Sequence, residues 1–182
     1  MNTLPLTIGL PAWLEAALAT AGPRPNRDAR MALAIDLSRQ NVAHGTGGPF
    51  GAVVADCDTG QIVSAGVNLV EHRSNSVLHA EIVAIMFPQR AVGAWTLAAP
   101  GLPRYEVVSS STPCAMCLGA VLWSGAAALV CGARPEDVRA IGFDEGPVFD
   151  GSFEYLRARG IDIVRDVRRA EAQAVLADYQ AR

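Results

Sequence analysis

The sequence predicts one α/β domain in which helices cover both faces of a five-stranded mixed sheet. Three observations favour this class. Apolar residues make up 51% of the 182-residue chain, which suits a folded core. Beyond residue 27, short β-rich runs alternate with longer segments of helical periodicity, a pattern typical of α/β domains. Two of the β-rich runs are joined by a short turn and predict a hairpin, so the sheet should be mixed.

The expected elements begin with a short helix over residues 11–21, ended by Gly22-Pro23. We assign it to an N-terminal extension over residues 1–26 and place the main domain at residues 27–182. The remaining elements are a helix over 27–42, strands over 51–55 and 61–67, a helix over 79–90, a strand over 105–109, a helix over 113–123, a strand over 127–131, short helices near Glu136 and Phe153, a strand over 161–164 and a helix over 168–179. The last two strands are separated by a helical crossover and should be parallel.

Two prolines bear on the limits of the predicted helices. Pro88 should disturb the helix that begins near His79, because proline lacks the backbone N–H that an interior helical position needs. Thr112 followed by Pro113 predicts the N-cap and the first position of the next helix.

Composition argues against several classes of function. The chain contains no lysine, and both a Schiff-base enzyme and a phosphate-binding P-loop need that amine. The net charge of −3 argues against a nucleic-acid partner, because proteins that bind a phosphate backbone usually carry a basic excess. The uncharged run 107–133 is broken by Pro113, Gly119 and Ser124-Gly125, so we expect a buried helix and strand there and no membrane partner. The N-terminus lacks the charge pattern of a secretory signal, and we expect a cytoplasmic protein.

Two short motifs carry metal-binding chemistry: His79-Ala80-Glu81 and Pro113-Cys114-Ala115-Met116-Cys117. Cys114 and Cys117 are three residues apart at the start of a predicted helix, so both thiols can reach one ion, and the helix dipole favours their thiolate forms. His79 and Glu81 are two residues apart and can share a site only at the mouth of a helix. The geometry therefore predicts a metal between two helix N-termini.

One zinc ion per subunit is the expected cofactor, with His79, Cys114 and Cys117 as its ligands. Three protein ligands leave a fourth position for water, as in catalytic zinc sites. Glu81 is then the candidate that takes the water's proton and returns it to the substrate. Taken alone, the cysteine pair equally fits a redox pair or half of a structural zinc site, and His79 alone fits a hydrogen-bonded core residue. The two motifs together, in this order, are the signature of zinc-dependent deaminases.

Over roughly residues 27–180 the chain resembles the cytidine-deaminase superfamily. Besides the zinc motifs, the segments 48–54, 65–68 and 117–120 are similar to its purine-acting branch. Residues 141–147 (Ile-Gly-Phe-Asp-Glu-Gly-Pro) are similar to a segment of bacterial guanine deaminases in which an acidic residue faces the substrate. The resemblance implies the cytidine-deaminase-like three-layer sandwich, with zinc as cofactor and a small-molecule purine base as substrate.

Guanine suits this assignment chemically, because its N1–H and 2-amino groups are adjacent donors that one carboxylate can accept together. Glu145 is the candidate for that contact and for helping to protonate the departing ammonia; the alternative is a solvated acidic loop. The resemblance implies that Asn68 hydrogen-bonds the base and that Phe50 shapes the pocket, although Phe50 equally fits core packing. It also implies a homodimer whose C-terminal segment crosses to complete the partner's site. Tyr179 would then be a lid residue; the alternative is an aromatic anchor on a terminal helix.

The expected reaction is the hydrolytic deamination of guanine to xanthine and ammonia, by a zinc-activated water with Glu81 as proton shuttle. Guanosine, aminotriazines and cytosine remain alternative substrates, and the acidic charge balance disfavours a tRNA-editing deaminase. Thr112 departs from the family pattern, because many purine-acting members carry glutamate at this position. From another class, a binding or regulatory module could retain zinc without turnover, but such a module has no need of the carboxylate of Glu81.

Overall fold

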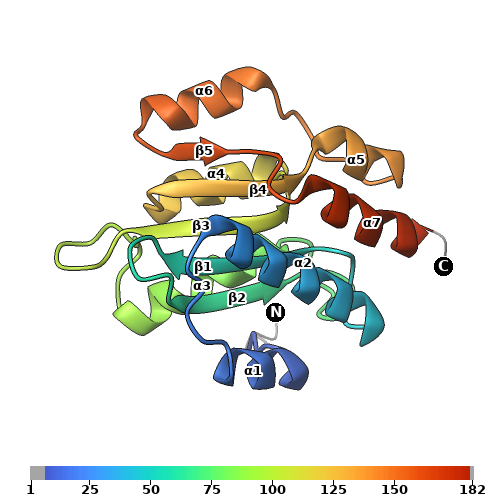
Figure 1. Ribbon diagram of the computed structural model, residues 1–182, viewed down its shortest axis with the longest axis horizontal. Helices are drawn as coiled ribbons and strands as arrows, with labels where there is room; N and C mark the ends of the chain where they lie inside the picture. The colour runs from blue at the N-terminus through green and yellow to red at the C-terminus, as the bar shows by residue number, and fades with distance from the viewer. Residues whose placement is uncertain (1–6, 181–182) are drawn as a thin grey trace, which may run out of the picture.

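A five-stranded mixed sheet lies at the centre of the molecule, with helices on both of its faces (Figure 1). The structure is a computed structural model that describes residues 7–180. Its elements are α1 (Ala12–Ala19), α2 (Arg27–Ala43), β1 (Gly51–Asp56), β2 (Ile62–Val67), α3 (Ala80–Val92), β3 (Tyr105–Ser111), α4 (Ala115–Ser124), β4 (Ala128–Ala133), α5 (Pro135–Ala140), α6 (Asp150–Ala158), β5 (Asp162–Val164) and α7 (Arg169–Gln180). The predicted fold class and the predicted order of elements are confirmed.

The strands lie in the order β2-β1-β3-β4-β5. β1 pairs antiparallel with β2, as expected for the hairpin, and antiparallel with β3. β3, β4 and β5 run parallel, because helical crossovers through α4 and then through α5 and α6 return the chain to the same end of the sheet. The carboxyl ends of β3 and β4 therefore lie together, and α4 and α5 start from that edge.

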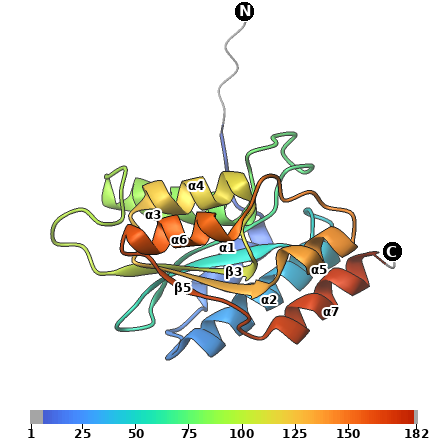
Figure 2. The ribbon, with the colours of Figure 1, turned by 90° about the horizontal axis from the view of Figure 1, so that it is seen from above.

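Separate helical layers cover the two faces of the sheet (Figure 2). α2 and α7 pack on one face, and α3, α4 and α6 pack on the other. Along β1, Val53 and Ala55 belong to the core on the α2 side, whereas Ala52 and Val54 belong to the core on the α3 side. A strand buried on both faces reads as a continuous apolar run, which is why β1 lacks the alternation of a half-exposed strand.

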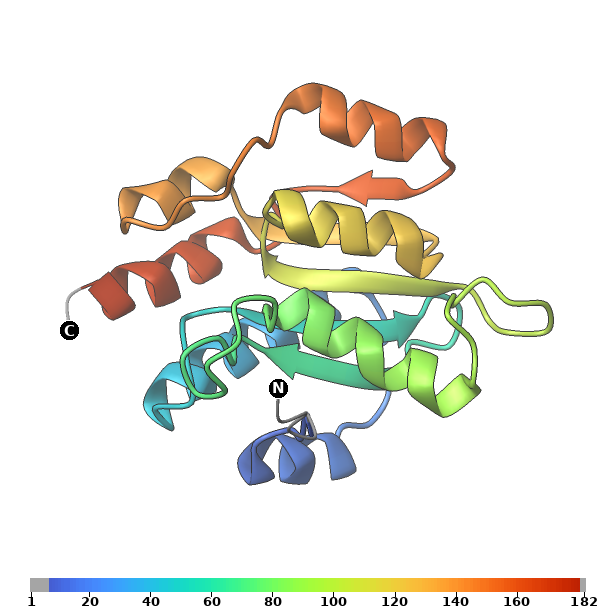
Figure 3. The same cartoon turned by 180° about the vertical axis from the view of Figure 1, so that it is seen from behind.

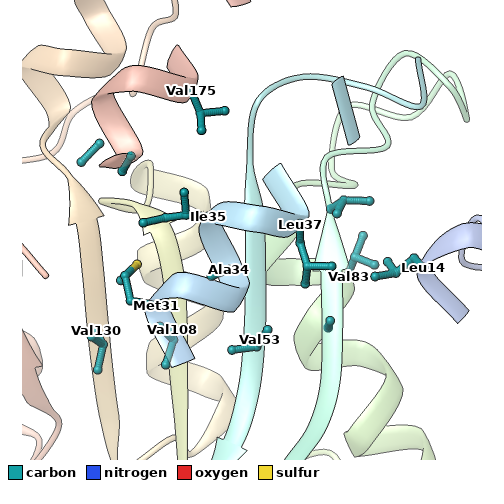
Figure 4. Close-up of a cluster of buried hydrophobic side chains, with 14 of the residues drawn as sticks. Leu14, Met31, Ala34, Ile35, Leu37, Val53, Val83, Val108, Val130 and Val175 are labelled. Atoms are coloured by element: carbon teal, nitrogen blue, oxygen red, sulfur yellow. The ribbon is translucent and has the colours of Figure 1, made fainter. Parts of the chain in front are cut away.

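Figure 4 shows the core on the α2 side, where Met31 and Ile35 of α2 meet Val53, Val108 and Val130 of the sheet. Leu14 of α1 is fully buried in the same cluster. α1 lies beside the β2 edge of the sheet (Figure 1), so the N-terminal helix adds to the main core.

α3 runs two residues past its predicted end at residue 90, and Pro88 does not interrupt it. The helix includes Pro88 and continues to Val92, and Gly93 ends it with a left-handed φ of 67°. A proline removes one helical hydrogen bond, but Ala84, Ile85 and Pro88 itself are buried. Packing of this buried side holds the helix together across the position that local propensity disfavours.

The predicted start of α4 is also wrong. Cys114 is the N-cap and the helix begins at Ala115, so Thr112 and Pro113 lie before it. The backbone N–H and the hydroxyl of Thr112 both donate to the carbonyl of Ala133, at 2.7 and 2.9 Å. The Thr112 hydroxyl thus continues the pairing between β3 and β4 instead of capping the helix.

The uncharged run 107–133 forms most of β3, all of α4 and all of β4, as the sequence predicted for a buried stretch. Within residues 7–180, no helix is both long enough and apolar enough to cross a bilayer.

Candidate active site

The three predicted metal ligands come together where α3 and α4 begin, on the same face of the sheet (Figure 3). His79 is the N-cap of α3, Cys114 is the N-cap of α4, and Cys117 lies in the first turn of α4. Their ligand atoms all lie within 4.8 Å of one another, with Sγ of Cys114 at 3.6 Å from Nδ1 of His79. The arrangement between two helix N-termini is the one that the spacing predicts.

The electrostatics of this cluster suit a soft divalent cation. Hydrogen bonds with Cys117 and with His79 lower the pKa of Cys114 to about 4. The hydrogen bond between His79 and Cys114 raises the pKa of His79. The hydrogen bond with Cys114, together with burial, raises the pKa of Cys117. A thiolate beside two further soft donors is a typical zinc donor set, whereas Mg²⁺ and Ca²⁺ prefer oxygen ligands. Three ligands also leave one coordination position open.

Glu81 lies in the first turn of α3, next to the ligand cluster, and is buried. The hydroxyl of Ser109, at the carboxyl end of β3, donates to Oε1 of Glu81 at 2.9 Å. Burial raises the pKa of Glu81, because a low-dielectric environment disfavours the charged carboxylate. The side chain is thus held in one orientation and is suited to take up a proton.

A cavity of about 240 Å³ opens onto the cluster. It is smaller than the pockets that hold drug-sized ligands, which measure roughly 300–1,000 Å³. It is lined by Gly48, Phe50, Asn68, Val70, Glu71, His79, Ala80, Glu81, Ser111, Thr112, Cys114, Phe143, Asp144, Glu145 and Tyr179. Every site residue predicted from the sequence lines this cavity except Cys117, which is fully buried behind it.

Glu145 lies in the connection between α5 and α6 and faces the same cavity. It is buried, whereas its neighbour Asp144 is exposed and accepts the backbone N–H of Gly146. The carbonyl of Glu145 accepts the backbone N–H of Ala115 at 3.0 Å, which fastens this loop to the start of α4. Burial, followed by the negative charges of Cys114 and Glu81, raises the pKa of Glu145 to about 7. The solvated-loop alternative describes Asp144 but not Glu145.

Asn68 follows β2 directly, and Phe50 precedes β1, so the hairpin brings both to one wall of the cavity. The Phe50 ring packs edge-on against Phe143, with centroids 5.2 Å apart. Phe143 in turn contacts Tyr179 of α7, with centroids 6.0 Å apart. Phe50 both lines the cavity and packs against the core, so its two interpretations coexist. Tyr179 reaches the cavity of its own chain.

Two contacts of the site were not anticipated. Phe143 lies within the segment 141–147, from which the sequence predicted only Glu145 as a site residue. Ser109 stands in a run of three serines in a buried strand. Buried hydroxyls need hydrogen-bond partners, and that need is the signal that could have directed attention to Ser109.

Residues 25–133 match the family model described as the cytidine and deoxycytidylate deaminase zinc-binding region. A guanine deaminase from Bacillus subtilis is 33% identical over 124 residues, which are 68% of this chain and 75% of that protein. A solved structure of the guanine deaminase from Nitrosomonas europaea is 43% identical, with a TM-score of 0.94 over 98% of this chain and 97% of that chain. Two further structures of the Nitrosomonas protein contain 2,6-diaminopurine and, in a mutant, 8-azaguanine; each is 43% identical with a TM-score of 0.93, and they cover 96% and 100% of this chain and 92% and 100% of the other.

Proposed function

Because the chain belongs to the cytidine and deoxycytidylate deaminase zinc-binding family, we propose that it catalyses the hydrolytic deamination of guanine to xanthine and ammonia. The observation that carries this proposal is a cavity in which two buried carboxylates, Glu81 and Glu145, face the same space as the metal ligands. The names of the Bacillus and Nitrosomonas relatives, and the 8-azaguanine complex of the latter, point to the same substrate.

His79, Cys114 and Cys117 would hold the zinc ion, which supplies an activated water at neutral pH. In the overall reaction, water adds its oxygen to C2 of guanine and the bond from C2 to the exocyclic nitrogen breaks. Both protons of the water leave its oxygen, and ammonia departs. The chain must therefore supply a group that accepts a proton near C2 and gives it back to nitrogen.

Glu81 is the group that we assign to this transfer. Glu81 lines the same cavity as His79 and Cys114, which suits contact with a water on the metal, and the Ser109 hydroxyl would orient its carboxylate. Burial raises the pKa of its carboxyl group, so Glu81 is suited to carry one proton of the water to the ring nitrogen and the second to the leaving amine, which departs as ammonia.

Glu145 and Asn68 are the residues that we assign to recognition of the base. A carboxylate at position 145 can accept the N1–H and 2-amino donors together, as the charge-assisted pairing of two donors with two oxygens requires. The side-chain amide of Asn68 lines the same cavity and offers two N–H donors, while its Oδ1 accepts the backbone N–H of Val70. Phe50 and Phe143 pack against each other and would form one apolar wall beside the planar ring.

A homodimer is the assembly that we propose. Among the described residues, many of the large exposed apolar side chains lie on or beside α3, α4 and α6: Val92, Trp95, Met116, Trp123, Phe149 and Tyr155. Trp95 is 77% exposed and Trp123 is 70% exposed, and large aromatic side chains exposed on one helical layer favour its use as an interaction surface. Exchange of the C-terminal segment stays a prediction: Tyr179 lines the cavity within one chain, and a segment exchanged between two copies would occupy the same place. Light scattering should show a dimer that Trp123→Glu converts to a monomer; a monomeric wild type would refute this assembly.

The substrate is tested by measuring ammonia release from guanine, guanosine, cytosine and adenosine by the zinc-loaded protein. Guanine should be the fastest substrate. Glu81→Gln should lower the rate at least about a hundredfold, in line with the usual contribution of general acid–base groups, while its zinc content stays equal to that of the wild type. Rapid release from another substrate with none from guanine would overturn the assignment. Activity that survives in Glu81→Gln would remove Glu81 from the proton transfer.

A further inference from the structure

A buried amide on α2 contacts the wall of the cavity that carries Asn68. Asn41 is fully buried, and its Nδ2 donates to the carbonyls of Gly48 and Asn68, both at 2.9 Å. Its Oδ1 accepts the hydroxyl of Thr46 at 2.6 Å. Both donors and the acceptor of the amide are therefore used, and each of these bonds joins α2 to the segments that bear Phe50 or Asn68.

The backbone at Gly47 lies so close to the backbone of Asn68 that there is no room for a side chain between them. Gly47 has a φ of 152°, and a Cβ on it would lie 1.9 Å from the carbonyl oxygen of Asn68 and 3.1 Å from Nδ2 of Asn41. The chain before β1 thus touches the chain after β2, and Asn41 bonds to both. Removing the amide would take the donor from the partly buried carbonyl of Asn68 and leave the carbonyl of Gly48 with the backbone N–H of Phe50 alone, which favours a shift of one segment against the other.

The same amide is connected to the N-terminal helix. Nε1 of Trp13 on α1 donates to the Thr46 hydroxyl at 3.1 Å, and that hydroxyl donates onward to Asn41. The Trp13 ring stacks on His44 with centroids 5.0 Å apart and planes 10° apart, while Leu14 fixes the helix in the core. A continuous chain of hydrogen bonds therefore runs from α1 through Thr46 and Asn41 to Asn68.

We propose that Asn41 is a positioning residue that sets the location of Asn68 in the cavity, and that α1 supports it through Trp13 and Thr46. Asn41 does not line the cavity among the described residues; it acts through the two carbonyls that it holds. This proposal rests on the proposed function in so far as Asn68 contacts the base. It makes residues 12–46 part of the base-recognition unit, although they lie outside both zinc motifs.

The test compares Asn41→Leu, which keeps the side-chain size but removes every hydrogen bond, with Ser38→Ala. Ser38 is the matched control because it is a buried polar residue on the same helix whose hydroxyl bonds only to Ile35 of that helix. Three kinds of measurement are made. Metal analysis gives the zinc content, binding and steady-state kinetics give the Kd for 8-azaguanine and the KM and kcat for guanine, and hydrogen–deuterium exchange follows the peptides covering 45–50 and 66–70.

Asn41→Leu should retain zinc, weaken 8-azaguanine binding and raise KM by about tenfold or more. This factor corresponds to the loss of about one to two kcal/mol of hydrogen bonding. Exchange should become faster in the two peptides, and kcat should change much less than KM. Ser38→Ala should match the wild type in binding and exchange. Thr46→Val removes the two bonds that its hydroxyl makes in this chain, and Trp13→Phe removes the bond of the indole N–H; both variants should show the same pattern to a smaller degree, because the two bonds from Asn41 to Gly48 and Asn68 remain.

Unchanged binding and exchange in Asn41→Leu, or equal effects in Ser38→Ala, would overturn the proposal. Should Asn41→Leu fail to fold, Thr46→Val decides: wild-type binding and exchange in that variant would also overturn it. Should the wild type neither bind 8-azaguanine nor release ammonia from guanine, the proposed function fails. The exchange data then still decide the positioning role, since faster exchange confined to 45–50 and 66–70 supports it and its absence refutes it.

Discussion

The hydrogen bond between Ser109 and Glu81 predicts a selective loss of catalytic rate in Ser109→Ala. Both side chains are buried, and the donor–acceptor distance is 2.9 Å. A hydrogen bond to a group that becomes charged contributes about 1.5–3 kcal/mol. If the bond matters fully in the transition state, its loss corresponds to about a 10- to 100-fold fall in kcat, with KM and zinc content nearly unchanged.

Ser110→Ala provides the matched control, because Ser110 is a buried serine on the same strand whose hydroxyl accepts the backbone N–H of Gly51 instead of contacting Glu81. Ser109→Thr keeps the hydroxyl on a residue that suits a strand and should restore most of the rate. Steady-state kinetics with guanine, metal analysis and thermal melts separate the effects. Wild-type kcat in Ser109→Ala, or an equal loss in Ser110→Ala, would refute the assignment of Ser109 as the residue that orients Glu81.

Four further outcomes follow from the structure. Glu145→Gln should lose guanine turnover by about 100-fold or more while keeping zinc, because an amide places donors against the donors of the base; kinetics with metal analysis checks this. Arg30→Met leaves Glu106 buried with one remaining partner, since Arg30 is 4% and Glu106 1% exposed, and should cost about 3 kcal/mol or about 6–12 °C in Tm, part of which the double variant Arg30→Met/Glu106→Gln regains. Hydrogen bonding to Arg169 lowers the pKa of Asp137 from 3.8 to about 2, and the stability that this adds is complete above the ordinary carboxyl pKa and is lost as the pH falls from about 4 to 2. The free energies of unfolding in urea of wild type and Asp137→Asn should therefore differ by up to about 2 kcal/mol at pH 7 and converge near pH 2. Removal of zinc by a chelator should abolish ammonia release and lower Tm, and added zinc should reverse both, because a ligand that binds only the folded state stabilises it.

The fold and the metal ligands were predictable because their signals are local. The β-rich runs, the helical segments and the order in which they alternate depend on periodicity over a few residues. Once both segments are assigned to helices, the motifs around His79 and Cys114 imply convergence at the two helix starts, because residues two apart share a site only at the mouth of a helix. The boundary errors at Pro88 and Thr112 have the opposite origin: tertiary burial and a hydrogen bond to Ala133 outweigh local propensity there.

The contacts that orient the site could not be predicted from pattern alone. Ser109 and Glu81 are 28 residues apart, and Asn41 and Asn68 are 27 residues apart. Such pairs meet only once the sheet order and the helix packing are set, and neither residue of a pair marks its partner in the sequence. Glu145 was found because its segment resembles one in known deaminases, whereas its burial and its attachment to α4 through Ala115 required the structure.

The charge of the cavity provides a separate constraint on its ligand. The acidic side chains at its wall are Glu71, Glu81, Asp144 and Glu145, and none of the described lining residues is an arginine. The chain has no lysine to take that role. With zinc bound, the thiolates of Cys114 and Cys117 would balance the charge of the ion, so a phosphate group entering the cavity would meet the acidic side chains without an arginine or lysine to pair with, which is unfavourable in a partly buried space. A neutral base avoids this repulsion and also presents donors to the carboxylates. The same lining that suits guanine therefore disfavours nucleotides, and it does so without any steric barrier.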